Sequence, residues 1–189
     1  DTRLSRGLGD VYKRQCVGMS TPQVHIIPLC IDQGLSIITG GKILSIMLFC
    51  AVLSRIIFGY ISDIIGPLKT LLIGSTLQMI TLILFIPFNT LTGLYVVSIL
   101  FGLSQGGIVP SYALIVKKYL PNKDAAERIG LIIFFTIIGM SIGGWMSGKI
   151  YDYTNSYSLG FLNSILWNLV NVMIIFYLFV SFKRSKVSI

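Results

Sequence analysis

An arginine inside an apolar stretch is the residue with the clearest chemical potential in this sequence. The segment LSRIIFGYISDIIGPLK, residues 53–69, carries Arg55, and Gly59 and Asp63 follow on the same helical stripe. Arginine in the middle of a membrane helix costs roughly 2.5–3.5 kcal/mol on insertion scales, so it usually faces a bundle interior or a water-filled cavity. We expect Arg55 to face such a cavity. The alternative is a structural arginine whose long stem reaches the lipid headgroups.

The end of the same segment predicts a contact that could hold one conformation. Asp63 stands where the apolar run ends, and Gly66, Pro67 and Lys69 form a tight turn into the next run. A carboxylate at a helix end, followed by a glycine and a basic residue, can dock against a neighbouring helix. We therefore expect this turn to take part in conformational change.

The composition indicates a membrane protein. The chain has 189 residues, of which 54% are hydrophobic and only 12% charged, whereas about a quarter of the residues of a soluble domain are charged. The mean hydropathy is +0.83. Cys16, Cys30 and Cys50 show no C-x-x-C spacing, so no zinc site or disulfide framework is predicted. We expect no metal, no cofactor and no catalytic residue.

The first fifteen residues, DTRLSRGLGDVYKRQ, differ from the rest because they are polar and lack an apolar core. They look like translated linker or adapter sequence, and we expect residues 1–15 to be non-native. Residues 16–189 then form one domain. A helix needs about 20 mostly apolar residues to cross a bilayer, which predicts an all-α bundle of six membrane spans, the first of them truncated. The predicted spans are residues 16–31, 43–62, 71–88, 93–116, 129–148 and 158–182.

The basic residues lie mainly on one side of the predicted membrane. One set of connections and the C-terminus hold eight of them: Lys69, Lys117, Lys118, Lys123, Arg128, Lys183, Arg184 and Lys186. The opposite set holds Lys42 and Lys149. Cytoplasmic loops carry an excess of Lys and Arg, so we expect a cytoplasmic C-terminus in a plasma membrane or bacterial inner membrane. The same placement explains the net charge of +8 without a nucleic-acid partner.

Glycines recur at four-residue spacing in two of the predicted spans. Small residues at this spacing let helix backbones approach closely in lipid, where the hydrophobic effect does not drive association. We expect both helices to pack inward through these residues. They are Gly102, Gly106, Gly139, Gly143, Gly144 and Gly148.

The pattern Gly59-x-x-x-Asp63-x-x-Gly66-x-x-Lys69 resembles the loop signature of the major facilitator superfamily, which occurs between its second and third and between its eighth and ninth helices. The resemblance covers residues 16–189 and implies that the six spans are the C-terminal half of a twelve-helix fold. Pro67 and Leu68 stand where the family often has more basic residues. The implied partners are the lipid bilayer and a missing N-terminal six-helix half.

A narrower resemblance, to monocarboxylate-transporter-like members, lies in VHIIPLCIDQGLS, residues 24–36. Arg55 then matches an arginine that binds the substrate carboxylate, which a guanidinium fork can hold by two hydrogen bonds. Ala51 replaces an aspartate that animal members use in proton coupling. In the family the seventh, eighth, tenth and eleventh helices line the cavity. The substrate-binding candidates are accordingly Arg55, His25, Gln105 and Tyr112.

The sequence thus predicts part of a secondary transporter that moves small organic anions, together with a coupling proton or ion, by alternating access. One alternative is a facilitator-fold carrier of a neutral or cationic solute, with Arg55 structural. A channel is less favoured because no charged or carbonyl-rich filter is apparent. An intramembrane serine protease is disfavoured, since Ser141 would need a base and His25 is the only histidine.

Overall fold

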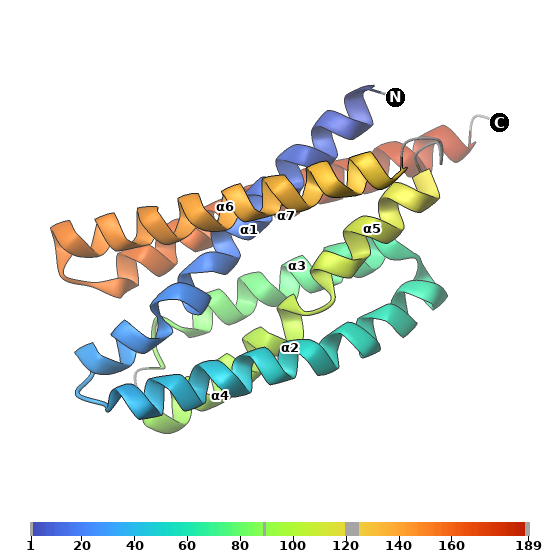
Figure 1. Ribbon diagram of the computed structural model, residues 1–189. Coiled ribbons are helices and arrows are strands. Elements are labelled where there is room, and N and C mark those ends of the chain that lie inside the picture. The colour runs from blue at the N-terminus through green and yellow to red at the C-terminus, as the bar shows by residue number, and fades with distance from the viewer. Residues whose placement is uncertain (1, 89, 120–124, 188–189) are drawn as a thin grey trace.

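The chain is an all-helical bundle, described here from a computed structural model that covers residues 2–88, 90–119 and 125–187 (Figure 1). Side chains are described for residues 9, 11–88, 90–118 and 126–181. The elements within these ranges are α1 (Thr2–Asp32), α2 (Ile37–Ile65), α3 (Pro67–Leu84), α4 (Leu91–Gln105), α5 (Ile108–Tyr119), α6 (Ala125–Thr154) and α7 (Tyr157–Val187).

Five segments of the described chain are long and apolar enough to cross a membrane. They are α2, α3, α4 together with α5, α6 and α7. The first helix, α1, is not among them, because its polar beginning and its Gln and His side chains lower its hydropathy. The predicted fold class, an all-α transmembrane bundle, is confirmed.

The helices fall into two groups of three. In Figure 1, α1, α6 and α7 form one group and α2, α3 and α4 the other, while α5 crosses from the second toward the first. Within the groups α1 contacts α6 and α7, and α4 contacts α2 and α3. Contacts of α1 with α2, of α3 with α7 and of α5 with α6 join the groups. Both chain ends lie at the same end of the bundle (Figure 1).

The first helix is longer than the sequence analysis predicted. It begins at Thr2 rather than at residue 16, and it continues through Pro22 and Pro28. Gln15 is fully buried and accepts a hydrogen bond from Ser75, 2.9 Å away, on α3. Residues 1–15 were set apart because they are polar, but Gln15 pairs with polar side chains of α3 and α7 inside the bundle. The helix thus extends beyond the predicted span 16–31 at its beginning, while the bounds of that span and the non-native origin of residues 1–15 stay predictions.

The predicted span 93–116 lies within one membrane-spanning segment, Leu91–Lys118, which is built from two helices. α4 ends at Gln105, and Gly106 and Gly107 form a turn before α5 begins at Ile108. Backbone groups freed by a break in a membrane helix must find other partners. The Ser54 hydroxyl on α2 donates a hydrogen bond to the Leu103 carbonyl in the last turn of α4.

Glycines bring α4 into close contact with α2. A Cβ atom added to Gly102 would lie 2.2 Å from the Met47 carbonyl oxygen, and one added to Gly106 would lie 2.1 Å from that of Ala51. Real Cβ atoms essentially never approach so closely. The contact between α6 and α1 is built in the same way, since a Cβ at Gly143 would lie 2.5 Å from the Val17 carbonyl oxygen.

The remaining glycines of this set pack less tightly. A Cβ at Gly139 would lie 2.6 Å from the Lys13 carbonyl oxygen, whereas Gly144 and Gly148 would meet Val24 and His25 at 3.4 and 3.5 Å. These last two distances are ordinary van der Waals contacts. The six glycines therefore all face neighbouring helices, four of them in contacts that exclude any side chain.

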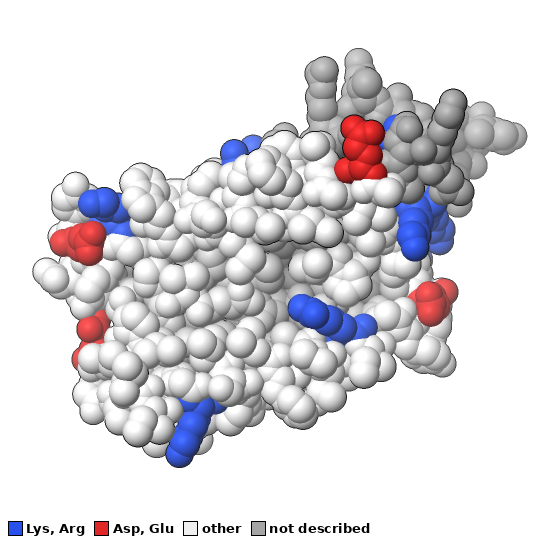
Figure 2. Space-filling view, in the orientation of Figure 1, with Lys and Arg blue, Asp and Glu red and all other residues white. Residues whose placement is uncertain are grey.

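Charged side chains on the face shown in Figure 2 gather mainly at the two ends of the bundle, and the surface between them is largely uncharged. Lys69, Lys117 and Lys118 lie near the end where α2 turns into α3 and are exposed. Lys42 and Lys149 lie near the opposite end. Lys123 lies outside the described residues, as do the side chains of Lys183, Arg184 and Lys186.

Changing Gly106 to valine is expected to destabilise the protein, because the new side chain would have to displace the backbone of α2. Overpacking of a close contact costs about 1–3 kcal/mol. We expect a lower melting temperature in detergent, measured by size-exclusion chromatography after heating. Gly130→Val is the matched control, since a Cβ there meets nothing within 4 Å. Equal melting temperatures for the two variants would contradict the close packing of α4 on α2.

Candidate functional site

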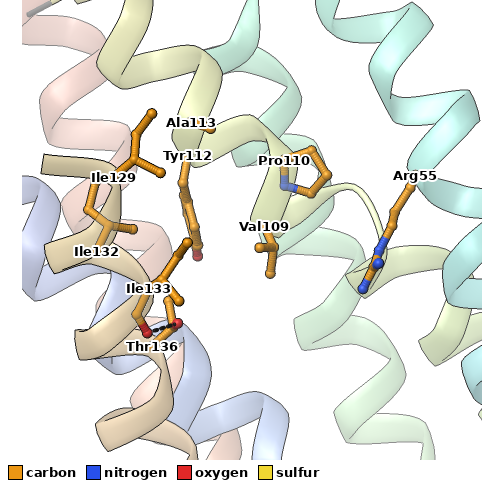
Figure 3. A pocket seen from close by; sticks show the side chains of 9 residues that line it. All are labelled: Arg55, Val109, Pro110, Tyr112, Ala113, Ile129, Ile132, Ile133 and Thr136. Atoms are coloured by element: carbon orange, nitrogen blue, oxygen red, sulfur yellow. Dashed lines mark hydrogen bonds between the residues drawn. The ribbon is translucent and has the colours of Figure 1, made fainter. Parts of the chain in front are cut away.

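A pocket lies where α2, α5 and α6 meet, and it has a volume of about 240 Å³. Figure 3 shows the residues around it: Arg55, Val109, Pro110, Tyr112, Ala113, Ile129, Ile132, Ile133 and Thr136. Arg55 comes from α2, and the others come from α5 and α6. The pocket is therefore an apolar wall of two helices that faces one basic side chain from a third.

Arg55 extends from α2 toward the α5 side of this pocket (Figure 3). Its side chain is exposed. Within the described residues no carboxylate pairs with it, and the ion pair found there joins Lys149 and Asp152 on α6, 3.9 Å apart. Because no described carboxylate holds it, this guanidinium can accept an anion without first breaking an internal ion pair.

The direction of Arg55 is set by the residue before it. Ser54 belongs to the buried stripe of α2, which is formed by Gly40, Ile43, Met47, Ala51, Ser54, Phe58 and Ser62. Its hydroxyl bonds to the Leu103 carbonyl on α4. Successive residues in a helix are about 100° apart, so fixing Ser54 against α4 turns Arg55 toward α5 and α6.

Two hydroxyl groups belong to the opposite wall, and neither is freely available. The Thr136 hydroxyl donates to the Ile133 carbonyl oxygen at 2.6 Å. Tyr112 is only 1% exposed, and its hydroxyl oxygen has no hydrogen-bond partner among the described residues. Figure 3 shows the ring of Tyr112 beside Ile133. Arg55 and Tyr112 thus line one pocket.

His25 lies elsewhere. Its Nε2 atom is 2.9 Å from the carbonyl oxygen of Gly144 on α6, and its ring centroid is 5.5 Å from that of Tyr157 on α7. It is half-buried between these helices and does not line the pocket of Arg55. The structure therefore gives His25 a polar contact within the bundle.

Gln105 also lies outside this pocket. It is the last residue of α4 and only 3% exposed. Its Oε1 atom accepts a hydrogen bond of 2.8 Å from Gln23 on α1, while its Nε2 atom has no partner among the described residues. Gln105 and Tyr112 were expected on one continuous helix, but the turn at Gly106 separates them.

Of the four residues of the predicted loop motif, Asp63 lines a second cleft at the end of the bundle. Asp63 lines it together with Lys117 and Lys118 from the end of α5, and its volume is about 280 Å³. Gly66 joins α2 to α3 with a φ of 90°, a conformation that favours glycine. Gly59 faces open space, and Lys69 is exposed on α3. The acidic and basic residues at this end are thus close enough to form a common site.

Sequence reasoning missed most of the apolar wall. In the sequence, four residues of this wall cannot be told from lipid-facing residues: Val109, Ile129, Ile132 and Ile133. A single threonine such as Thr136 does not indicate a site by itself. Only the i, i+3, i+4 spacing of Ile129, Ile132, Ile133 and Thr136 marks one face of a helix. That face became meaningful only when the fold placed it opposite Arg55.

Comparison with known proteins identifies this architecture. The sequence profile of the Major Facilitator Superfamily matches residues 18–188. The chain belongs to the Major Facilitator Superfamily. With five segments that are able to cross a membrane, it is an integral membrane protein.

Individual relatives agree with this assignment. The chain is 24% identical over 147 residues to monocarboxylate transporter 13 of Rattus norvegicus, covering 77% of this chain and 34% of that protein. It is 25% identical over 149 residues to the MFS-type transporter opdF of Penicillium oxalicum, covering 75% and 35%. The chain thus spans about a third of the length of these relatives.

A solved structure shows the same fold. The crystal structure of the POT family transporter PepTSo superposes with a TM-score of 0.81 at 13% identity. The superposition covers 93% of this chain and 37% of that one. This facilitator chain therefore has the helix arrangement of part of that transporter.

Changing Ser54 to alanine is expected to lower stability, because it leaves the Leu103 carbonyl without its partner at the end of α4. Hydrogen bonds between membrane helices are worth about 1 kcal/mol, so we expect a modest fall in melting temperature in detergent. Ser45→Ala is the matched control, since Ser45 bonds only to Gly41 in its own helix. If both variants melted together, the Ser54 bond would not fix the rotation of α2.

Proposed function

We propose that this chain is the C-terminal half of a secondary active transporter that moves small monocarboxylate-like organic anions by alternating access. The single observation that carries the proposal is Arg55, which lines a pocket with the apolar face of α5 and α6 and has no carboxylate partner among the described residues. A planar guanidinium fork fits a carboxylate by two hydrogen bonds. Tyr112 is the second proposed substrate contact, through its ring.

The pocket has walls on only some of its sides. α2 carries large apolar residues that are exposed next to Arg55, among them Val52, Ile56 and Tyr60. On α6, the large apolar side chains of Phe134 and Ile137 are also exposed. An N-terminal six-helix bundle packed over this surface would complete the cavity, and rocking of the two bundles would expose it to each side in turn. The length of the relatives, about three times the matched region, supports a second bundle.

The charges at the bundle ends support an orientation. Lys69, Lys117 and Lys118 lie at the end that also holds both chain ends, and an excess of basic residues marks the cytoplasmic side. The C-terminus is therefore proposed to be cytoplasmic, in a plasma membrane or bacterial inner membrane. Asp63, beside Lys117 and Lys118, is proposed to hold the cytoplasmic end in one conformation.

A coupling proton or ion is part of the proposal. Ala51, one turn before Arg55, offers no carboxylate for a proton. Among the described residues, His25 is the candidate proton carrier, because an imidazole can bind and release a proton. Gln105 at the end of α4, which accepts a hydrogen bond from Gln23 on α1, is a candidate polar contact for the substrate.

Changing Arg55 to alanine in the full-length protein is expected to abolish uptake of radiolabelled pyruvate and benzoate in proteoliposomes. The reason is the loss of the only basic side chain among the described residues that line the pocket. Arg55→Lys keeps the charge but not the fork, so we expect it to retain a small part of the uptake.

Lys42→Ala is the matched control, because it removes a positive charge from the same helix at the opposite end. Its uptake and membrane abundance should equal those of the wild type. Unchanged anion uptake by Arg55→Ala at normal abundance would make Arg55 structural and would favour a neutral or cationic substrate.

A further inference from the structure

We infer that the wall of α5 and α6 makes this carrier selective for monocarboxylates with an apolar body, aliphatic or aromatic, over dicarboxylates and hydroxylated acids. The inference rests on the proposed role of Arg55 in holding the carboxylate. The carbon chain or ring of the substrate, which the guanidinium does not contact, is recognised by residues of α5 and α6 that face Arg55 across the pocket (Figure 3).

The charge of the pocket lining favours a substrate with a single carboxylate. Arg55 is the only charged residue among the nine that line the pocket. A second carboxylate on the substrate would lose its water against the isoleucines of α6 without gaining a positive partner, and a desolvated unpaired charge is strongly unfavourable. The lining therefore matches a substrate with one negative charge.

The wall offers a substrate few hydrogen-bond partners. A substrate hydroxyl over the wall would also need a partner, but the two residues of the wall that carry hydroxyl groups, Thr136 and Tyr112, are only 9% and 1% exposed. Leaving a polar group unsatisfied typically costs enough to weaken binding by about tenfold. The wall thus disfavours acids whose carbon chain carries a hydroxyl group.

The aliphatic side chains of the wall can contact an apolar substrate body. Six lining residues carry aliphatic side chains: Val109, Pro110, Ala113, Ile129, Ile132 and Ile133. Ile133 and Val109 are about half exposed in this chain, so a substrate body can cover them. Each buried methylene strengthens binding by about fourfold, equivalent to about 0.8 kcal/mol. Affinity should therefore increase along a series of unbranched acids until the pocket is full.

The test measures competition against uptake of radiolabelled benzoate by the full-length protein in proteoliposomes. The competitors are acetate, propionate, butyrate and valerate, together with 3-hydroxybutyrate and succinate, which keep the four-carbon chain of butyrate. We expect inhibition constants to fall by about fourfold for each methylene. We expect 3-hydroxybutyrate and succinate to compete about tenfold less well than butyrate.

Variants assign the effect to the wall. For Ile133→Ala, the inhibition constants should depend less on the chain length of the acid. For Ala113→Leu, the longest acid that still competes well should be shorter, because the larger side chain fills part of the pocket. Leu131→Ala is the matched control, since Leu131 is exposed on α6 and does not line the pocket. It should leave the whole series unchanged.

The outcomes separate this inference from the proposed function. If Arg55→Ala abolishes benzoate uptake but succinate and 3-hydroxybutyrate compete as well as butyrate, the wall does not select the substrate and this inference is wrong. The same holds if Leu131→Ala changes the series as much as Ile133→Ala. If no acid competes, or Arg55→Ala transports normally, the proposed function fails and the inference fails with it.

Discussion

An unpaired guanidinium among aliphatic side chains is the constraint on which the site depends. Hydrocarbon cannot solvate the charge, and no described carboxylate neutralises it, so water or a bound anion must. The fold meets this requirement by placing Arg55 at the edge of a pocket rather than in a sealed contact. An arginine in this position is expensive unless it serves a purpose, which is the physical reason for assigning it to the substrate.

Close backbone packing puts the guanidinium in place. Gly102 and Gly106 allow α4 to lie directly against Met47 and Ala51 on α2, and in lipid such contacts are a main source of helix association. The same contact brings Ser54 to the carbonyl groups at the end of α4. The helix break at Gly106 and Gly107 then lets α5 leave α4 toward α6. As a result, the apolar wall and Arg55 face each other although they come from three helices.

The sequence was informative where physical rules are local. Hydropathy located the spans, because bilayer thickness fixes their length, and the isolated charge of Arg55 stood out against its neighbours. The first helix was harder to recognise, since Gln15 is acceptable only because Ser75 and other polar groups meet it inside the bundle. The wall residues around Ile133 could not be distinguished from lipid-facing residues, because both kinds of surface select the same side chains. His25 was a reasonable candidate by chemistry, yet only the fold shows that it contacts Gly144 and Tyr157 instead of the pocket of Arg55.

The most direct test of the central claim asks whether position 55 faces water and substrate. Arg55→Cys, in a full-length background without other cysteines, would be treated in membranes with a charged, membrane-impermeant thiosulfonate. Leu77→Cys, exposed on α3 away from the pocket, serves as the comparison. The account predicts rapid modification at position 55, slowed by saturating benzoate, and little at position 77. Resistance of position 55 to this reagent, with ready reaction toward a lipid-soluble maleimide, would place the side chain among the acyl chains and contradict the account.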